Sequence, residues 1–242
     1  MKRLLYFLPV LYLAACCSTQ VSAASGDTLR IMRCTDFTVT GYGDNPAWND
    51  APWIELLQRG GTDRPQATRI KTLYSESGIY FLFRCADTQL TATMEADNLE
   101  LWREDVVEIF LAPDPDCWDH FEYELSPLGY QLPLHVARQG ERIARWIPFR
   151  IAGSDDPQIG RAVTVEGGRQ APTARVTGWT AECYIPFAAL SPFKNIPPQS
   201  GTVWRGNFYR VDYDYNETID WVWRPVSGSY HNTDEYGTLI FE

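Results

Sequence analysis

Residues 68–85 read Thr-Arg-Ile-Lys-Thr-Leu-Tyr-Ser-Glu-Ser-Gly-Ile-Tyr-Phe-Leu-Phe-Arg-Cys, and this stretch decides the fold. Two alternating runs, Thr68 to Tyr74 and Ile79 to Cys85, enclose the turn-forming residues Ser75 to Gly78. This arrangement predicts a β-hairpin. Because side chains alternate across a strand, every second residue from Ile79 to Cys85 shares one face, which we expect to lie in the core.

Similar short runs follow along the chain, separated by loops rich in Gly, Pro and Asp. Helical periodicity is almost absent, although Pro186 to Leu190 could make one turn. Many short strands, each with one apolar face, must bury that face against another sheet, which predicts an all-β sandwich or barrel. The further predicted strands are Val106 to Leu111, Phe121 to Leu125, Trp179 to Ile185, Val203 to Asp212 and Thr238 to Phe241.

The N-terminal residues have the layout of a secretory signal. Lys2 and Arg3 precede a short apolar run that ends in Leu13-Ala14-Ala15-Cys16, as a signal peptide requires. The run is too short to span a bilayer. A cleavage site ending in cysteine resembles the bacterial lipobox, in which Cys16 would be lipidated. Ordinary cleavage after Ala23 is the alternative.

We therefore expect a signal peptide with lipobox and short tether in residues 1–24, and one β-sandwich domain in residues 25–242, since no linker divides them. The protein would be secreted across the inner membrane. It would be lipid-anchored in the bacterial outer membrane or at the cell surface, and the lipid would be its sole membrane contact.

Charge and composition restrict the ligand. The formal net charge of −10 argues against nucleic acid, because phosphate binding needs clustered Lys and Arg. Aromatic residues make up 14% of the chain, more than a core of this size requires, so some are expected to face a ligand. The cysteines lack paired C-x-x-C spacing, which argues against a zinc site, and Cys85 and Cys183 are expected to be buried thiols.

Four segments, taken in order, carry a family resemblance. They are Gly43-Asp44-Asn45-Pro46-Ala47-Trp48, Leu101-Trp102-Arg103-Glu104-Asp105-Val106-Val107-Glu108-Ile109-Phe110, Gly178-Trp179-Thr180-Ala181-Glu182-Cys183-Tyr184-Ile185-Pro186-Phe187, and a closing portion with Trp204 to Arg210 and Tyr230 to Leu239. With these segments the chain resembles the family 9 carbohydrate-binding modules, which implies a jelly-roll-like antiparallel β-sandwich and non-catalytic carbohydrate binding. The resemblance also implies a role in carbohydrate catabolism, no obligatory cofactor, and a monomer.

The resemblance implies a site in which a sugar or glycan chain end lies between two aromatic rings. By position the first ring is Trp102, and the second is Tyr230, where the family usually has Trp. Tyr offers a smaller face, so affinity or sugar preference should differ. Glu108 corresponds to a hydroxyl-binding acid, and His231 follows the second ring. No catalytic residues and no metal ligands are implied.

The chemistry of sugars agrees with this site. Pyranose rings have apolar faces and hydroxyl edges, so they need flat aromatic surface and a few fixed polar groups. Asp105 lies near Glu108 in sequence and is a further candidate. Asn207 and Arg210 are separated by an odd number of residues on one strand, so they cannot share a face. Asn207 is favoured, and Arg210 is the weaker candidate.

Each candidate also has a structural interpretation. Trp102 could be a loop aromatic that covers the core, Asp105 could cap a turn, and Glu108 could pair with an Arg across the sheet. Four other polar residues are expected in solvent, namely Glu122 and Glu124 on the outer face of a strand, and His120 and His231 in loops.

An acidic loop raises the question of calcium. Asp114, Asp116 and Asp119 could supply hard oxygen ligands, and the resemblance allows structural calcium. The glycine and terminal Glu of a calcium-binding loop are missing, so an Asp-rich turn is the favoured interpretation.

Three rival functions stay open. A glycosidase could use Glu104, Asp105 and Glu108 if two carboxyl groups opposed each other across the bond, but nothing in the sequence constrains a second acid to oppose the first. Separately, no Gly-x-Ser-x-Gly elbow for a serine nucleophile is present. A haem-binding sandwich could draw on the two methionines and three histidines of the mature chain. The residues available to haem are Met32, Met94, His120, His135 and His231. The third rival is a protein that kept the fold but lost the sugar site.

Overall fold

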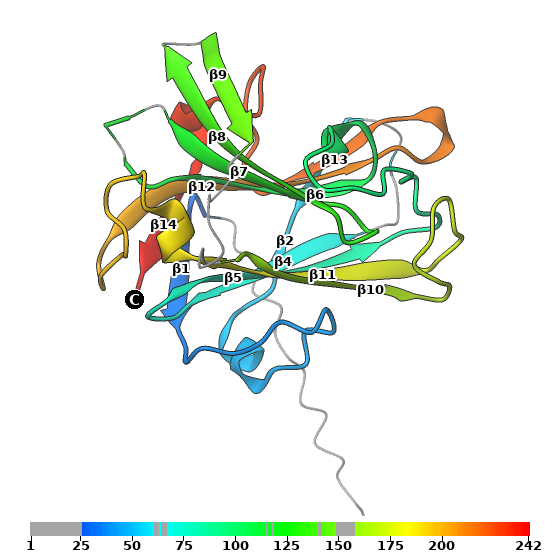
Figure 1. Ribbon diagram of the computed structural model, residues 1–242, viewed down its shortest axis with the longest axis horizontal. Helices are drawn as coiled ribbons and strands as arrows, with labels where there is room; N and C mark the ends of the chain where they lie inside the picture. Colours follow the sequence, from blue (N-terminus) through cyan, green and yellow to red (C-terminus); the bar gives the residue numbers. More distant parts are fainter. Residues whose placement is uncertain are drawn as a thin grey trace, which may run out of the picture.

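The computed structural model describes residues 26–60, 63, 67–114, 116–117, 119–139, 142–148 and 158–242. Two layers of strands lie face to face (Figure 1). The predicted all-β, jelly-roll-like sandwich is therefore confirmed. The expected Cys16 anchor and signal peptide lie outside the described residues.

The first sheet contains the predicted hairpin. Its strands, in spatial order, are β10 (Gly160–Glu166), β11 (Gly178–Pro186), β5 (Gly78–Ala86) and β4 (Thr68–Tyr74), with the short β2 (Ile54–Glu55) beside β4.

The second sheet carries the candidate site. Its strands, in spatial order, are β14 (Gly237–Phe241), β12 (Val203–Asp212), β6 (Val106–Ala112), β7 (His120–Leu125), β8 (Gln131–Gln139) and β9 (Arg142–Pro148). Beside β12 lies β13 (Ile219–Val222), which pairs with β3 (Leu57–Arg59).

The strand β1 (Thr28–Arg33) joins the two sheets. Its first four residues pair with β14 and its last two residues pair with β4, both in parallel. The other strand pairs are antiparallel. The predicted antiparallel sandwich is thus correct except at this joining strand.

The core lies between the sheets. Ile79, Phe81, Phe83 and Cys85 are buried there, as the alternation predicted. Val107, Ile109 and Leu111 of β6 face them from the second sheet. The residues between them on β6, Glu108 and Phe110, therefore face the outer side of the second sheet.

The segment between β1 and β2, residues 34–53, covers the outer face of the first sheet (Figure 1). Trp48 in the 3-10 helix η1 (Pro46–Asp50) is buried there against Tyr80 and Leu82. The indole of Trp48 donates to Glu182 at 2.8 Å, and the amide of Gly41 donates to the same carboxylate at 2.8 Å. A buried carboxylate with several donors fixes this segment in place.

The remaining helices are single 3-10 turns. They are η2 (Leu101–Arg103), η3 (Phe187–Leu190), η4 (Asp214–Asn216) and η5 (Thr233–Glu235). The predicted turn at Pro186 to Leu190 corresponds to η3. Among the described residues, no helix has the length and apolar character needed to cross a membrane. Cys85 and Cys183 are buried free thiols, as expected.

Candidate functional site

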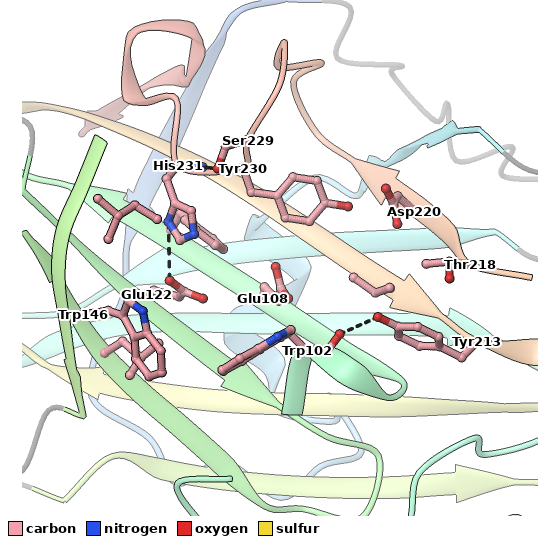
Figure 2. Close-up of a pocket in the computed structure, with 14 residues that line it drawn as sticks. Trp102, Glu108, Glu122, Trp146, Tyr213, Thr218, Asp220, Ser229, Tyr230 and His231 are labelled. Carbon is pink, nitrogen blue, oxygen red and sulfur yellow. Dashed lines mark hydrogen bonds and ion pairs between the residues drawn. The ribbon is translucent and has the colours of Figure 1, made fainter. Parts of the chain in front are cut away.

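A cavity of about 390 Å³ opens on the outer face of the second sheet. This volume lies in the lower part of the range of small-molecule sites. Its walls come from η2, β6 to β9, β12, β13 and the loop before η5 (Figure 2). The lining residues are Trp102, Glu108, Phe110, Glu122, Leu134, Ile143, Trp146, Val211, Tyr213, Thr218, Asp220, Ser229, Tyr230 and His231.

The pocket brings together four of the seven predicted site residues. Trp102, Glu108, Tyr230 and His231 all line it, so the two loops expected to converge do so. Figure 2 shows Trp102 and Tyr230 on opposite sides, with Glu108 between them. The other three predicted residues do not line the pocket.

Trp102 forms one wall together with a ring that sequence reasoning missed. Trp146 on β9 meets it edge to face, with 5.7 Å between ring centroids, and Trp146 is 47% exposed. Trp102 is half-buried, and Leu101 beside it is buried among Val106, Leu134 and neighbouring residues. The hydroxyl of Tyr213 donates to the carbonyl of Trp102 at 2.6 Å, which fixes the backbone of η2.

Tyr230 forms the opposite wall. Its ring stacks on Tyr209, with centroids 4.0 Å apart and planes within 8°. Its carbonyl accepts hydrogen bonds from Tyr209 at 3.2 Å and Tyr236 at 2.7 Å. Figure 2 shows the hydroxyl of Tyr230 directed toward Asp220. Tyr209 covers one face of the ring, and the guanidinium carbon of Arg59 lies over the ring, 5.5 Å from its centroid. The edge and hydroxyl of Tyr230 line the pocket.

Asn207 supports this wall rather than lining the pocket. Its side-chain amide donates to the hydroxyl of Tyr209 at 2.7 Å and to the carbonyl of Arg224 at 2.9 Å. Its oxygen accepts from the amides of Phe208 and Arg224. All these bonds are internal, so Asn207 positions Tyr209 beneath Tyr230.

Carboxyl groups form the floor of the pocket. Glu108 faces Glu124 across the β6–β7 pair, and Glu122 lies beside them. The expectation that Glu122 and Glu124 are solvated is wrong, because they are 5% and 0% exposed. The β8–β9 hairpin and the Trp102 turn cover this face of the sheet, which the sequence did not predict. Tyr209 is the residue opposite Glu108 on β12, and no ion pair joins Glu108 to an Arg among the described residues. One oxygen of Glu108 is buried without a hydrogen bond.

Burial changes the protonation of this floor. It raises the pKa of Glu108 well above its usual value, and the nearby carboxyls of Glu122 and Asp220 raise it further. Burial raises the pKa of Glu122 to about 7. Burial, followed by the charges of Glu108 and Glu122, also raises the pKa of Glu124. Protonated carboxyls can donate as well as accept hydrogen bonds, which suits sugar hydroxyls.

Two histidines adjoin the floor. The expectation of an exposed loop residue is wrong for His120, which lies on β7 and is fully buried. His231 lies in a loop as expected, and its side chain is 22% exposed. Nε2 of His120 lies 3.1 Å from Nδ1 of His231. Burial, aided by Arg138, lowers the pKa of His231 to about 4, so its ring is neutral at neutral pH.

Arg210 lies between the two sheets, on the opposite side of β12 from the pocket. Its guanidinium is fully buried and contacts Asp212 at 2.7 Å and Asp87 at 3.0 Å. It also donates to the carbonyl of Ala86 at 2.7 Å. Arg210 and Asn207 are three residues apart on β12. The sequence therefore correctly predicted that their side chains lie on opposite faces of this strand. The weaker candidate for sugar binding is thus placed in the interior.

Asp105 has the structural role considered for it. It is fully buried, and its two oxygens accept from the amides of Thr91 at 2.6 Å and Tyr213 at 2.9 Å. Burial, and then the charges of Asp87 and Asp212, raise its pKa well above the usual value. Asp105 therefore ties the loop after β5 to the end of β12.

The acidic loop is held by internal contacts. Asp114 accepts from the amide of Asp116 at 3.1 Å and pairs with Lys194 at 2.9 Å, while Asp119 accepts from Arg138 at 3.1 Å. In the described part of the chain, two groups of side chains are close enough to share a metal ion, and neither includes these residues. They are His120 with Glu122 and His231, and Asp87 with Asp105 and Asp214. Calcium at the acidic loop stays a prediction.

The residues considered for haem are dispersed. Met32 is 40% exposed on β1, and Met94 packs beside Leu101. Neither methionine lines the pocket, where His231 is the lining histidine. A Met and His ligand pair within this cavity is therefore not formed.

Replacing Glu108 with Gln should make the stability of the protein decline less as the pH rises from about 5 to about 8. A carboxyl whose folded pKa is raised above its ordinary 4.5 binds more protons folded than unfolded, so stability falls as pH rises through that interval, by about 1.4 kcal/mol per pKa unit. Gln cannot ionise, so the decline between about pH 5 and about pH 8 should be smaller.

Urea unfolding at both pH values measures this effect. His231, whose pKa is lowered to about 4, acts in the opposite direction at acidic pH and is common to both proteins. Glu95→Gln, at an exposed position, is the control and should unfold with the wild-type pH dependence. An unchanged pH dependence in Glu108→Gln would contradict the assignment of a buried, protonated floor.

The protein is a β-sandwich with an open pocket on the outer face of one sheet, and the pocket has aromatic walls and a polar floor. This combination suits the binding of carbohydrate. Residues 39–242 match the family model described as carbohydrate family 9 binding domain-like. The chain belongs to this family. The family resemblance predicted from the sequence is confirmed, and with it the non-catalytic carbohydrate-binding class.

Solved structures agree on the fold. A protein from Bacteroides uniformis, provisionally assigned as carbohydrate-binding, superposes with a TM-score of 0.72 at 19% identity, over 90% of this chain and 100% of that one. A family 9 carbohydrate-binding module from Caldicellulosiruptor kristjanssonii in complex with cellotriose gives 0.62 at 16% identity, over 89% and 93%. The glucose complex gives 0.60 at 16% identity, over 88% and 96%. No curated protein sequence matches the chain significantly.

Proposed function

We propose that the pocket on the second sheet binds a sugar or the end of a glycan chain. Trp102 and Trp146 supply apolar ring surface on one side, and Tyr230 supplies its ring edge and hydroxyl on the other. Glu108 and Asp220 bond the hydroxyl edge. The observation that carries the proposal is the convergence of Trp102 and Tyr230, from distant segments, on one cavity with a carboxyl floor.

Several features support binding without cleavage. A glycosidase needs two carboxyl groups on opposite sides of the bond it cuts. Here Glu108, Glu122 and Glu124 lie on adjacent strands of one floor, so they approach a ligand from the same side. Asp105 accepts two backbone hydrogen bonds away from the pocket, and Glu104 accepts hydrogen bonds from Thr93 and Met94.

The wider setting belongs to the same proposal. The protein is exported and anchored through a lipid on Cys16, acts as a monomer, and presents bound glycan to a carbohydrate-degrading system at the cell envelope. The basic start, short apolar run and small residues before Cys16 support this placement. Labelling of the protein with a fatty acid, lost in Cys16→Ser, tests it.

A carbohydrate array followed by calorimetry tests the binding function. The array should include glucose and cellotriose, which occupy the solved relatives, together with amino sugars and other oligosaccharide ends. Saturable binding to at least one ligand is expected. Failure to bind any member would overturn the proposal, and release of reducing sugar or a Soret band after expression with haem would replace it with a rival function.

A further inference from the structure

The end of the pocket holds two imidazoles and a carboxylate in close contact. His120 and Glu122 are two residues apart on β7 and therefore share one face of the strand. His231 reaches them from the loop before η5 (Figure 2). One nitrogen or oxygen from each side chain lies within 4.8 Å of the others.

The spacing of these atoms matches a metal coordination shell. Nε2 of His120 is 3.1 Å from Nδ1 of His231, and Oε2 of Glu122 is 3.7 Å from the same nitrogen. Zinc binds His nitrogen and carboxylate oxygen at about 2.0–2.2 Å, which separates tetrahedral ligand atoms by about 3.3–3.6 Å. One of the two observed distances lies just below this range and the other just above it.

Glu122 supplies an independent indication of a missing ligand. Its side chain is 7% exposed, and Oε2 is buried without a hydrogen-bond partner. A buried carboxylate oxygen costs free energy unless a donor or a cation satisfies it. The oxygen is directed toward His231 (Figure 2), 3.7 Å from its Nδ1.

The surroundings hold the two rings in position. Phe110 stacks against His120, with centroids 5.7 Å apart, and lies 5.4 Å from the ring of His231. Arg138 donates a hydrogen bond to the backbone carbonyl of His231. Such support fixes ring orientation before a metal binds, as in sites with organised outer shells.

We propose that His120, Glu122 and His231 form a three-ligand site for a divalent ion of the zinc class. Two imidazoles and one carboxylate suit Zn²⁺ and its late first-row neighbours better than calcium or magnesium, which prefer oxygen ligands. Three protein ligands leave a coordination position open. Glu122 and His231 line the pocket proposed to bind sugar, so the metal site adjoins it.

Zinc titration of the purified protein, prepared without a polyhistidine tag and stripped with EDTA, tests the site. We expect one Zn²⁺ per chain at micromolar affinity or tighter, and visible d–d bands on substitution with Co²⁺. Removing a supporting outer-shell residue typically costs 10–100-fold in affinity. Loss of a ligand in Glu122→Gln or His231→Ala should therefore cost at least about 100-fold.

His135→Ala is the matched control, because His135 on β8 pairs with Asp119 outside the cluster. It should bind zinc as the wild type does. Circular dichroism of each variant without metal establishes that it folds, and Glu122→Gln keeps the shape of the side chain. Absence of zinc binding, or equal binding by all four proteins, would overturn the site. Metal-free protein that binds sugar but not zinc would overturn this site and leave the sugar proposal standing.

Discussion

Replacing Arg210 with Met should destabilise the protein by about 3–5 kcal/mol. The guanidinium is the cation that contacts both Asp87 and Asp212 in the interior, and none of its surface is exposed. Met fills similar volume but leaves two buried carboxylates without this partner. For a domain of this size the loss corresponds to a fall in melting temperature of roughly 6–20 °C.

The pH dependence identifies the cause of this loss. Burial already raises the pKa of Asp87 to about 6, although Arg210 opposes this rise. Without Arg210 the pKa should rise further, so stability of the variant should fall more steeply as pH increases through neutrality. Arg30→Met, which breaks a surface pair with Glu242, is the control and should change stability by less than about 1 kcal/mol. Wild-type stability in Arg210→Met would contradict the structural role.

The sequence predicted the strands whose alternation is regular. The hairpin around Ser75 to Gly78, the strands β6, β7, β11, β12 and β14, and the turn η3 all occur where the pattern placed them. It missed β1, β2, β3, β8, β9, β10 and β13. β8 contains Pro133 and a register shift after Ala137, and β9 mixes Arg with apolar residues, so neither shows simple alternation. β1 is stabilised by pairing with two distant strands, which no local pattern reveals.

The failure to predict the β8–β9 hairpin also explains two errors at the site. Because the β8–β9 hairpin was not predicted, Trp146 was missed, and the β7 carboxyls beneath the hairpin were expected in solvent. A Trp among Ile143 and Ile147 in a β-prone run was the signal available. The cluster of His120, Glu122 and His231 was missed for another reason. His120 and His231 lie far apart in the sequence and meet only through folding, so no local pattern could indicate this cluster.

Replacing Trp102 with Ala should reduce sugar affinity by at least about 2 kcal/mol, or roughly 30-fold. The ring lines the pocket and forms the wall opposite Tyr230 (Figure 2). Calorimetric titration with the best ligand from the array measures the change. Trp53→Ala is the matched control, since Trp53 packs beside Trp48 on the other sheet and should leave affinity unchanged.

A double-mutant cycle with Trp146→Ala separates ligand contact from mutual support of the two rings. Trp102 and Trp146 touch edge to face, and residues in contact typically show coupling of about 0.5–3 kcal/mol. If both rings form one wall, the double variant should lose less affinity than the sum of the single losses, because each single variant already disturbs the other ring. Exact additivity would make Trp146 an independent contact. Wild-type affinity in Trp102→Ala would remove this wall from the binding site altogether.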